Sequence, residues 1–171
     1  MKEILAVTGV TGKKSGGAFA KKLGGNMDEV RRRFPGGVRA IVRASSDTSH
    51  LDREIPGATK CVGALEDIDF LKDTFSGVDT VVHIAGISWS REVVTAAAQS
   101  HVRRLILVHT TGIYSKYKAA GEEYRQIDAF VYQTCKENGI LLTILRPTMI
   151  YGNVTDHNVV TFIRMVDRLP L

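Results

Sequence analysis

Residues 4–17, ILAVTGVTGKKSGG, set the pattern of the whole chain, because a short apolar run leads directly into a turn rich in glycine. The apolar run is typical of a strand that is covered on both faces of a sheet. A stretch with helical spacing begins at residue 16, immediately after the turn. The order of strand, glycine-rich turn and helix predicts the first unit of an α/β sheet.

The same alternation continues along all 171 residues. We expect strands at residues 3–8, 38–43, 59–62, 80–85, 104–109 and 141–146, and helical stretches at 16–34, 67–75, 90–100 and 116–138. Gly24, Gly25 and Asn26 should divide the first helical stretch in two. Right-handed crossovers then give a Rossmann-like, doubly wound parallel sheet in a three-layer α/β/α arrangement. We expect a single domain over residues 1–171.

The glycine-rich turn is suited to holding phosphate. Glycines permit a tight turn and let a diphosphate approach the backbone, while the start of the following helix offers free N–H groups. The turn is therefore expected to contact a cofactor through Gly9, Thr11, Gly12, Lys13, Ser15 and Gly16. A P-loop of the form GxxxxGK[ST] is excluded, because its two possible registers require other residues at Val7 and Lys14 or at Lys13.

The overall composition is that of a globular protein. Hydrophobic residues make up 44% of the chain and charged residues 24%, which argues against a disordered or fibrous protein. The apolar runs are too short to span a bilayer, and the first residues do not follow a signal-peptide pattern. We therefore expect a cytoplasmic protein without a membrane partner.

The positive charge is concentrated near the start of the chain. The net charge is +5, and residues 1–50 hold ten basic and four acidic residues. Such a surplus fits either nucleic acid or a phosphate-bearing cofactor. Because no basic patch interleaved with aromatic residues is present, we expect the cofactor and no nucleic acid. A solvated helix face with Arg31, Arg32 and Arg33 would account for part of the same surplus.

The cysteines and histidines indicate structural roles. Cys61 and Cys135 lie far apart in no CxxC pattern, which indicates free thiols. The five histidines lack the short spacings of a zinc site, so we expect no metal. His83 and His109 fall in strand-like runs, where we expect them to be hydrogen-bonded within the fold.

The glycine-rich turn resembles that of the short-chain dehydrogenase/reductase superfamily, on its extended and atypical side. This side includes the NAD-dependent epimerase/dehydratases and the NmrA-like NAD(P)-binding proteins. Residues 9–12, GVTG, resemble the GxTG turn of these proteins. The third glycine of the pattern would fall at Ser15, whereas this chain has Gly16, and Lys13 and Lys14 replace the usual apolar residues.

The resemblance implies further cofactor contacts. Arg43 ends the second expected strand, where an acidic residue would favour NAD and an arginine suits the 2′-phosphate of NADP. We therefore expect NADP, with NAD as the alternative. Residues 63–65, GAL, resemble the family's GDL with its acid lost, and residues 146–152 resemble RPxxxYG. From these segments the resemblance implies cofactor contacts at Leu65, Ala85, Gly86, Arg146 and Pro147.

The resemblance also suggests catalytic residues after the fifth expected strand. Tyr114 and Lys118 have the family's YxxxK spacing, in which a lysine lowers the tyrosine pKa and binds the nicotinamide ribose. Thr110 or Thr111 would polarise the substrate oxygen. Residues 110–114 also resemble the family's SSxxVYG, whose tyrosine is separate from the catalytic one. A second YxxxK match at residues 132–136 lies late in the same helical stretch, away from the ligand-binding sheet edge.

These residues leave two functions open. The first is an NAD(P)-dependent oxidoreductase or epimerase/dehydratase that acts on a small carbonyl or hydroxyl compound, such as a sugar nucleotide, by hydride transfer. The second is a non-catalytic NAD(P)-binding redox sensor of NmrA-like type that acts through a regulatory partner. The resemblance covers the cofactor domain, and we expect the C-terminal substrate-binding part to be largely absent. An apolar segment at residues 159–169 would pack against more protein, form a homo-oligomer contact, or pack back on the sheet.

Overall fold

The computed structural model describes residues 3–13, 15–115, 120–148, 150 and 157–169. Its centre is a sheet of six parallel strands in the order β3-β2-β1-β4-β5-β6. The strands are β1 (Leu5–Thr8), β2 (Val38–Val42), β3 (Thr59–Val62), β4 (Thr80–His83), β5 (Arg104–Val108) and β6 (Leu141–Leu145). All six expected strands are confirmed, and the strand order is that of the doubly wound Rossmann fold.

Helices connect the strands. They are α1 (Ser15–Gly24), α2 (Met27–Arg33), α3 (Leu51–Glu54), α4 (Ile68–Phe75), α5 (Ser90–Gln99), α6 (Ala120–Glu137) and α7 (His157–Asp167), with short 3-10 turns η1 (Ile87–Trp89) and η2 (Thr111–Tyr114). The expected break near Gly24 is confirmed. A Cβ at Gly24 would overlap the carbonyl oxygen of Glu54, so α1 ends where it meets α3. Helix α3 and both 3-10 turns were not predicted from the sequence.

Two apolar cores lie on opposite faces of the sheet, which confirms the three layers. On one face, side chains of α4, α5 and α6, such as Phe75, Val93 and Val131, pack together in one core. On the other face, α1, α2 and α3 pack through Ala20, Val30 and Leu51. Strand β1 contributes to both cores, because its successive side chains point to opposite faces.

The direction in which strands are added to the sheet reverses between the neighbouring strands β1 and β4. From β1 the chain continues to β2 and β3 toward one edge of the sheet, whereas from β4 it continues to β5 and β6 toward the other edge. In an open parallel sheet, ligands bind in the crevice beyond the carboxyl ends of the strands at this switch point. The carboxyl ends of β1 and β4 carry the glycine-rich turn and residues 84–89.

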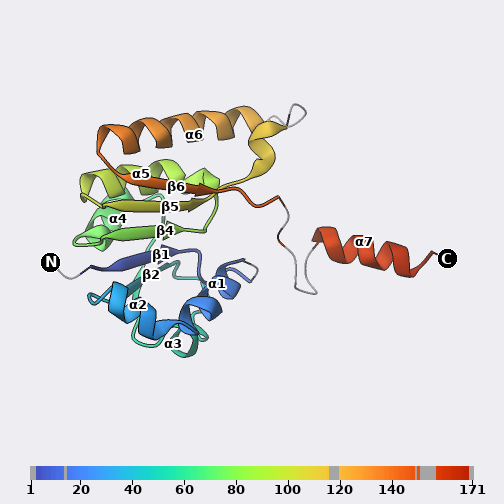
Figure 1. The fold of residues 1–171 in the computed structure, drawn as a ribbon, viewed down its shortest axis with the longest axis horizontal. Helices are drawn as coiled ribbons and strands as arrows, with labels where there is room; N and C mark the ends of the chain where they lie inside the picture. Colours follow the sequence, from blue (N-terminus) through green and yellow to red (C-terminus); the bar gives the residue numbers. More distant parts are fainter. Residues whose placement is uncertain (1–2, 14, 116–119, 149, 151–156, 170–171) are drawn as a thin grey trace.

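The C-terminal region leaves apolar side chains in solvent. Leu141 and Leu145 of the edge strand β6 are about half exposed. Figure 1 shows α7 standing apart from the sheet and its covering helices. Phe162 and Ile163 of α7 are 61% and 57% exposed. The expected apolar helix is therefore present, and in this single chain it does not pack back on the sheet.

The helices of the described residues are all too short or too polar to cross a lipid bilayer.

Candidate functional site

The turn after β1 has a backbone that only glycine can adopt. Gly9 has a φ of +80°, and a Cβ there would lie 2.6 Å from the backbone nitrogen of Ala85. The Gly12 N–H donates to the carbonyl of Gly9 over 3.1 Å and closes the turn. The first glycine thus lets the turn after β1 lie directly against the segment after β4.

Gly16 packs the start of α1 onto the same turn. A Cβ at residue 16 would overlap the carbonyl oxygen of Gly9, so any other residue would displace the helix. Close packing of helix on strand is the role of the third glycine in dinucleotide-binding turns. The family pattern placed this glycine at Ser15. The structure assigns the packing role to Gly16, and the turn is one residue longer than usual.

A cavity of about 560 Å³ opens at the carboxyl ends of β1 to β4. Nine of the expected cofactor residues line it: Gly9, Thr11, Gly12, Lys13, Ser15, Gly16, Arg43, Leu65 and Ala85. Eight further residues line the cavity: Ile41, Val42, Ser45, Ser46, Gly63, Glu66, Ile84 and Trp89. The turn, the end of β2 and the end of β3 thus meet around one space, as the strand order requires.

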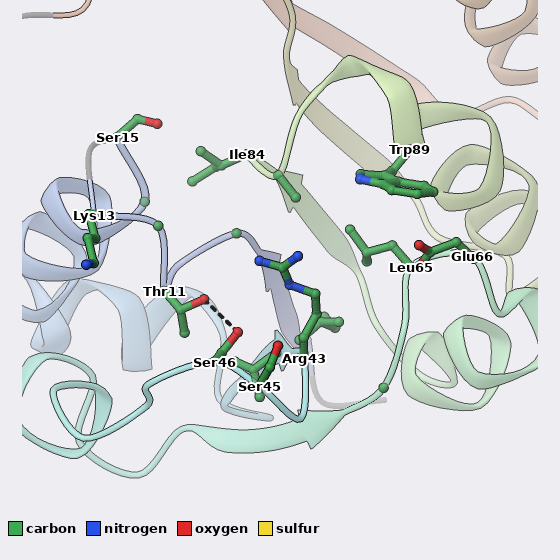
Figure 2. A pocket seen from close by; sticks show the side chains of 17 residues that line it. Thr11, Lys13, Ser15, Arg43, Ser45, Ser46, Leu65, Glu66, Ile84 and Trp89 are labelled. Atoms are coloured by element: carbon green, nitrogen blue, oxygen red, sulfur yellow. Dashed lines mark hydrogen bonds between the residues drawn. The ribbon is translucent and has the colours of Figure 1, made fainter. Parts of the chain in front are cut away.

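One side of the cavity is polar and basic. Figure 2 shows the guanidinium of Arg43 projecting into the cavity, with Ser45 and Ser46 beside it. The Thr11 hydroxyl donates to the Ser46 hydroxyl over 3.3 Å, which ties the glycine-rich turn to the loop after β2. Within the described part of the chain, Arg43 forms no ion pair with a carboxylate. Its charge therefore remains available to an anion.

The other side of the cavity is more apolar. Figure 2 shows Trp89 near Leu65 and Glu66, across the cavity from the glycine-rich turn. Trp89 is the single tryptophan of the sequence and is half-buried. Neither Trp89 nor Glu66 was expected at the site, because each lies outside a recognisable motif and reaches the cavity only through the fold.

A buried histidine joins β1 to β4 beneath the cavity. His83 Nε2 lies 2.8 Å from the carbonyl oxygen of Gly86, and Nδ1 lies 2.7 Å from the Thr8 hydroxyl. Burial lowers the pKa of His83 to about 4, so the neutral ring donates to Gly86 and accepts from Thr8. The structural role expected for His83 is confirmed. Gly86 does not line the cavity, but this hydrogen bond fixes its position below the lining residues.

The expected catalytic residues that the structure describes, Thr110, Thr111 and Tyr114, do not line the cavity. Tyr114 is 71% exposed at the end of η2, and the extended backbone of Ser115 ends that turn. The Thr110 hydroxyl accepts a hydrogen bond from the Gly112 N–H over 3.0 Å and caps η2, and Thr111 begins it. Lys118 lies outside the described residues. Tyr114 is therefore in a short turn of its own rather than on the described part of α6.

Arg146 and Pro147, the remaining expected contacts, follow β6 and do not line the cavity. The Arg146 Nη2 group lies 2.6 Å from Asp128 Oδ2. Asp128 Oδ1 lies 2.7 Å from His109 Nδ1, and His109 Nε2 lies 2.9 Å from the Ser90 hydroxyl. The hydrogen-bonded role expected for His109 is confirmed. Arg146 pairs with Asp128 through Nη2, whereas its buried Nη1 has no hydrogen-bond partner among the described residues.

Both cysteines are free, as expected. Cys135 is buried in the core, and burial raises its thiol pKa to about 11. Cys61 is partly buried on β3, and burial raises its pKa as well. Neither residue lines the cavity.

Residues 30–169 match the model of a protein family described as NAD(P)H-binding. No curated protein matches the chain at a significant level. Many solved structures share the fold, including short-chain dehydrogenase/reductase proteins.

Three of these structures illustrate the likeness. DesIV, a dTDP-glucose 4,6-dehydratase from Streptomyces venezuelae solved with NAD, is 16% identical with a TM-score of 0.72, over 96% of this chain and 62% of its own. WbmH from Bordetella bronchiseptica, solved with NAD⁺, is 18% identical with a TM-score of 0.65, over 98% and 64%. An NADPH-dependent quinone oxidoreductase from Escherichia coli is 20% identical with a TM-score of 0.59, over 84% and 46%. This chain spans about half to two thirds of the length of these three structures.

Proposed function

Because the chain belongs to the NAD(P)H-binding family, we propose that its cavity holds NADP(H) and that the protein transfers hydride between this cofactor and a small carbonyl or hydroxyl compound. The resemblance to the short-chain dehydrogenase/reductase superfamily is confirmed by the family match and by the fold that the chain shares with proteins of that superfamily. The family match shows NAD(P)H binding, and the shared fold supports an oxidoreductase-like function. The phosphorylated cofactor, the substrate class and the residue roles are our proposal.

The cavity residues support a dinucleotide. The glycine-rich turn and the start of α1 would take the diphosphate, because the turn brings backbone N–H groups and the positive end of the helix to one place. A volume of about 560 Å³ falls within the range of cofactor pockets. The cavity lies at the switch point of the sheet, where such ligands bind in this fold class.

Arg43 is the observation that carries the choice of NADP. It stands at the end of β2, where an acidic residue would accept hydrogen bonds from the ribose of NAD. Its guanidinium enters the cavity beside the hydroxyls of Ser45 and Ser46 (Figure 2). A guanidinium and two hydroxyls form a donor set suited to a phosphate. We assign these three residues to the 2′-phosphate.

The proposed hydride transfer uses residues after β5. The nicotinamide supplies the hydride when it is bound. Tyr114 would exchange a proton with the substrate oxygen, Lys118 would hold the nicotinamide ribose, and Thr110 or Thr111 would donate a hydrogen bond to that oxygen. Thr110, Thr111 and Tyr114 follow β5, at the same carboxyl edge of the sheet as the cavity, which supports this assignment.

A redox sensor without turnover is the second candidate, and the exposure of Tyr114 favours it. A general acid needs to lie within hydrogen-bond reach of the reacting oxygen. Tyr114 is 71% exposed and stands outside the cavity lining. In this alternative, the protein binds NADP(H) and passes the redox state of the cofactor to a partner, with the apolar face of α7 as one surface for self-association.

Turnover distinguishes the two candidates. NADPH oxidation is followed with a panel of quinones, aldehydes, ketones and keto-sugar nucleotides, using the wild type, Tyr114→Phe and a matched Tyr132→Phe control on the exposed surface of α6. The enzyme predicts turnover with at least one compound, a loss of about 100-fold or more in Tyr114→Phe, and no change in the control. Tight NADPH binding with no turnover, including in any longer form of the protein, supports the sensor.

A further inference from the structure

Four polar side chains form a buried chain of hydrogen bonds beside the cavity. They come from four different elements: Ser90 begins α5, His109 follows β5, Asp128 lies on α6 and Arg146 follows β6. The hydroxyl-to-imidazole, imidazole-to-carboxylate and carboxylate-to-guanidinium distances are 2.9, 2.7 and 2.6 Å. We call these four residues the buried network. None of its members lines the cavity.

The acceptors fix the direction of the hydrogen bonds. The Asp128 carboxylate accepts from Arg146 and from Nδ1–H of His109. Burial lowers the pKa of His109, and the charge of Arg146 lowers it further, although Asp128 opposes both effects. The ring is therefore neutral at pH 7, and its Nε2 atom accepts from the Ser90 hydroxyl.

The order serine, histidine, aspartate is that of a hydrolytic triad, yet the burial excludes that chemistry. Ser90 is fully buried, and the His109 side chain has no exposed surface. A nucleophile must reach its substrate, and this hydroxyl cannot. A buried ion pair also adds little net stability compared with apolar packing. The network therefore acts by fixing the positions of the side chains that form it.

The position of Ser90 indicates what this geometry controls. Ser90 directly follows Trp89, which lines the cavity, and its N–H donates to the carbonyl of Ile87. Ile87 is itself buried in the core. Trp89 thus lies between two fixed residues. Ile87 is packed in the apolar core, and the Ser90 hydroxyl is hydrogen-bonded to His109.

We propose that Ser90 and His109 are positioning residues that hold Trp89 in the wall of the cavity and thereby set the affinity for the bound nucleotide. The part that concerns affinity rests on the proposed function, whereas the part that concerns Trp89 does not. Neither residue touches the ligand. Asp128 and Arg146 act one step further back, because they fix the tautomer and the orientation of the imidazole.

Trp89 reports on this arrangement directly, because it is the single tryptophan of the chain. Its emission wavelength and its quenching by acrylamide are measured in the ligand-free protein, together with the NADPH dissociation constant by calorimetry. The variants are Ser90→Ala, which removes one hydroxyl, and His109→Asn, which keeps a donor toward Asp128 and removes the acceptor for Ser90. Ser100→Ala is the matched control at the far end of α5, where the hydroxyl donates to the carbonyl of Lys72.

In Ser90→Ala and His109→Asn, we expect emission at longer wavelength, faster quenching, and NADPH binding weaker by about threefold to tenfold, the range of one hydrogen bond. Ser100→Ala should match the wild type in all three. The double variant Ser90→Ala/His109→Asn should resemble the single variants, because both remove the same contact. If His109→Asn does not fold, Ser90→Ala decides the matter alone, since it leaves the ion pair intact.

Three outcomes distinguish a failure of this inference from a failure of the proposed function. Unchanged emission and quenching in folded Ser90→Ala overturn the positioning role, even if the variant is less stable. A changed Trp89 signal with an unchanged dissociation constant overturns the link to affinity. A wild-type protein that binds no NADPH contradicts the proposed function, while the Trp89 measurements still test the positioning role.

Discussion

The polar groups at the carboxyl ends of the strands differ between the two halves of the sheet. Beyond β1, β2 and β3, Thr11, Arg43 and Ser46 face an open cavity. Beyond β5 and β6, His109 and Arg146 are turned inward and joined through Asp128. The polar groups of the first half therefore face the cavity, whereas His109 and Arg146 of the second half bond to Asp128 within the fold. A charged residue at a strand end indicates a binding site only when it does not form an ion pair or hydrogen bond with another residue of the fold.

Removing the central carboxylate of the buried network should have the largest effect. Asp128→Ala leaves the Arg146 charge and the His109 N–H without their buried acceptor, and we expect a loss of about 3–5 kcal/mol in the free energy of unfolding. Urea unfolding followed by circular dichroism measures it. The control is Asp69→Ala, whose ion pair with Lys72 is exposed and should cost less than about 1 kcal/mol. Equal losses in the two variants would mean that the second half is not held by its network.

Acid should lower the free energy of unfolding through His83, whose hydrogen bond to Thr8 joins β4 to β1. The pKa of His83 is about 4 in the folded protein against an ordinary value of 6.5, so the unfolded chain binds more protons between these values. Stability therefore falls as the pH drops from about 6.5 to about 4, by about 3 kcal/mol from this residue. Urea unfolding across this range checks the slope.

The variant His83→Asn should flatten part of that slope. His109, whose pKa is also lowered by burial, contributes to the remainder, as do Asp79 and Glu122 near pH 4, because hydrogen bonds and ion pairs lower their pKa values. His101→Asn is the matched control, because His101 is exposed and its φ of 57° suits asparagine. If the free energy of unfolding of His83→Asn depends on pH as it does in the wild type, His83 is not the group that titrates in this range.

The glycine-rich turn should be more sensitive in binding than in stability. Gly16→Ala places a Cβ on the Gly9 carbonyl oxygen, so the start of α1 must move. We expect a loss of about 1–3 kcal/mol in stability and NADPH binding too weak to measure by calorimetry. Gly25→Ala is the control, because its Cβ would meet only ordinary contacts at 3.6 Å and beyond. Wild-type binding in Gly16→Ala would show that the diphosphate does not use this turn.

The sequence predicts those features that depend on neighbouring residues. Six apolar runs predict the six strands, and the glycines at 9, 12 and 16 predict the turn, because strand burial and tight turns leave local patterns. The break at Gly24 is equally local. The packing role of Gly16 became clear only from its contact with Gly9, since a shift of one residue is invisible without the backbone.

The missed features depend on contacts across the fold. Glu66 and Trp89 reach the cavity from the loops after β3 and β4, and no local pattern marks them. Arg146 was expected to contact the cofactor because of its motif. Its partner Asp128 lies 18 residues away on α6, and that pairing was not readable from the chain. Tyr114 matched a spacing of four residues, but it lies in η2, which ends at the extended Ser115 before the described part of α6 begins.

Replacing Arg43 should have the smallest effect of the four changes predicted for this chain. It should alter only the preference for NADPH over NADH. Arg43→Ala should weaken NADPH binding about tenfold, the size of one charge-assisted contact, and leave NADH binding and stability unchanged. Arg53→Ala provides the control, because Arg53 is exposed on α3 and pairs with its neighbour Glu54. A preference for NADPH that survives in Arg43→Ala would assign the 2′-phosphate to other residues.

Calorimetric titration of the wild-type protein with NADPH and with NADH tests the central claim most directly. We expect saturable binding of both nucleotides at one site per chain, with NADPH about tenfold tighter because Arg43 enters the cavity. Absence of heat with either nucleotide, together with an unchanged melting temperature at saturating concentrations, would contradict it.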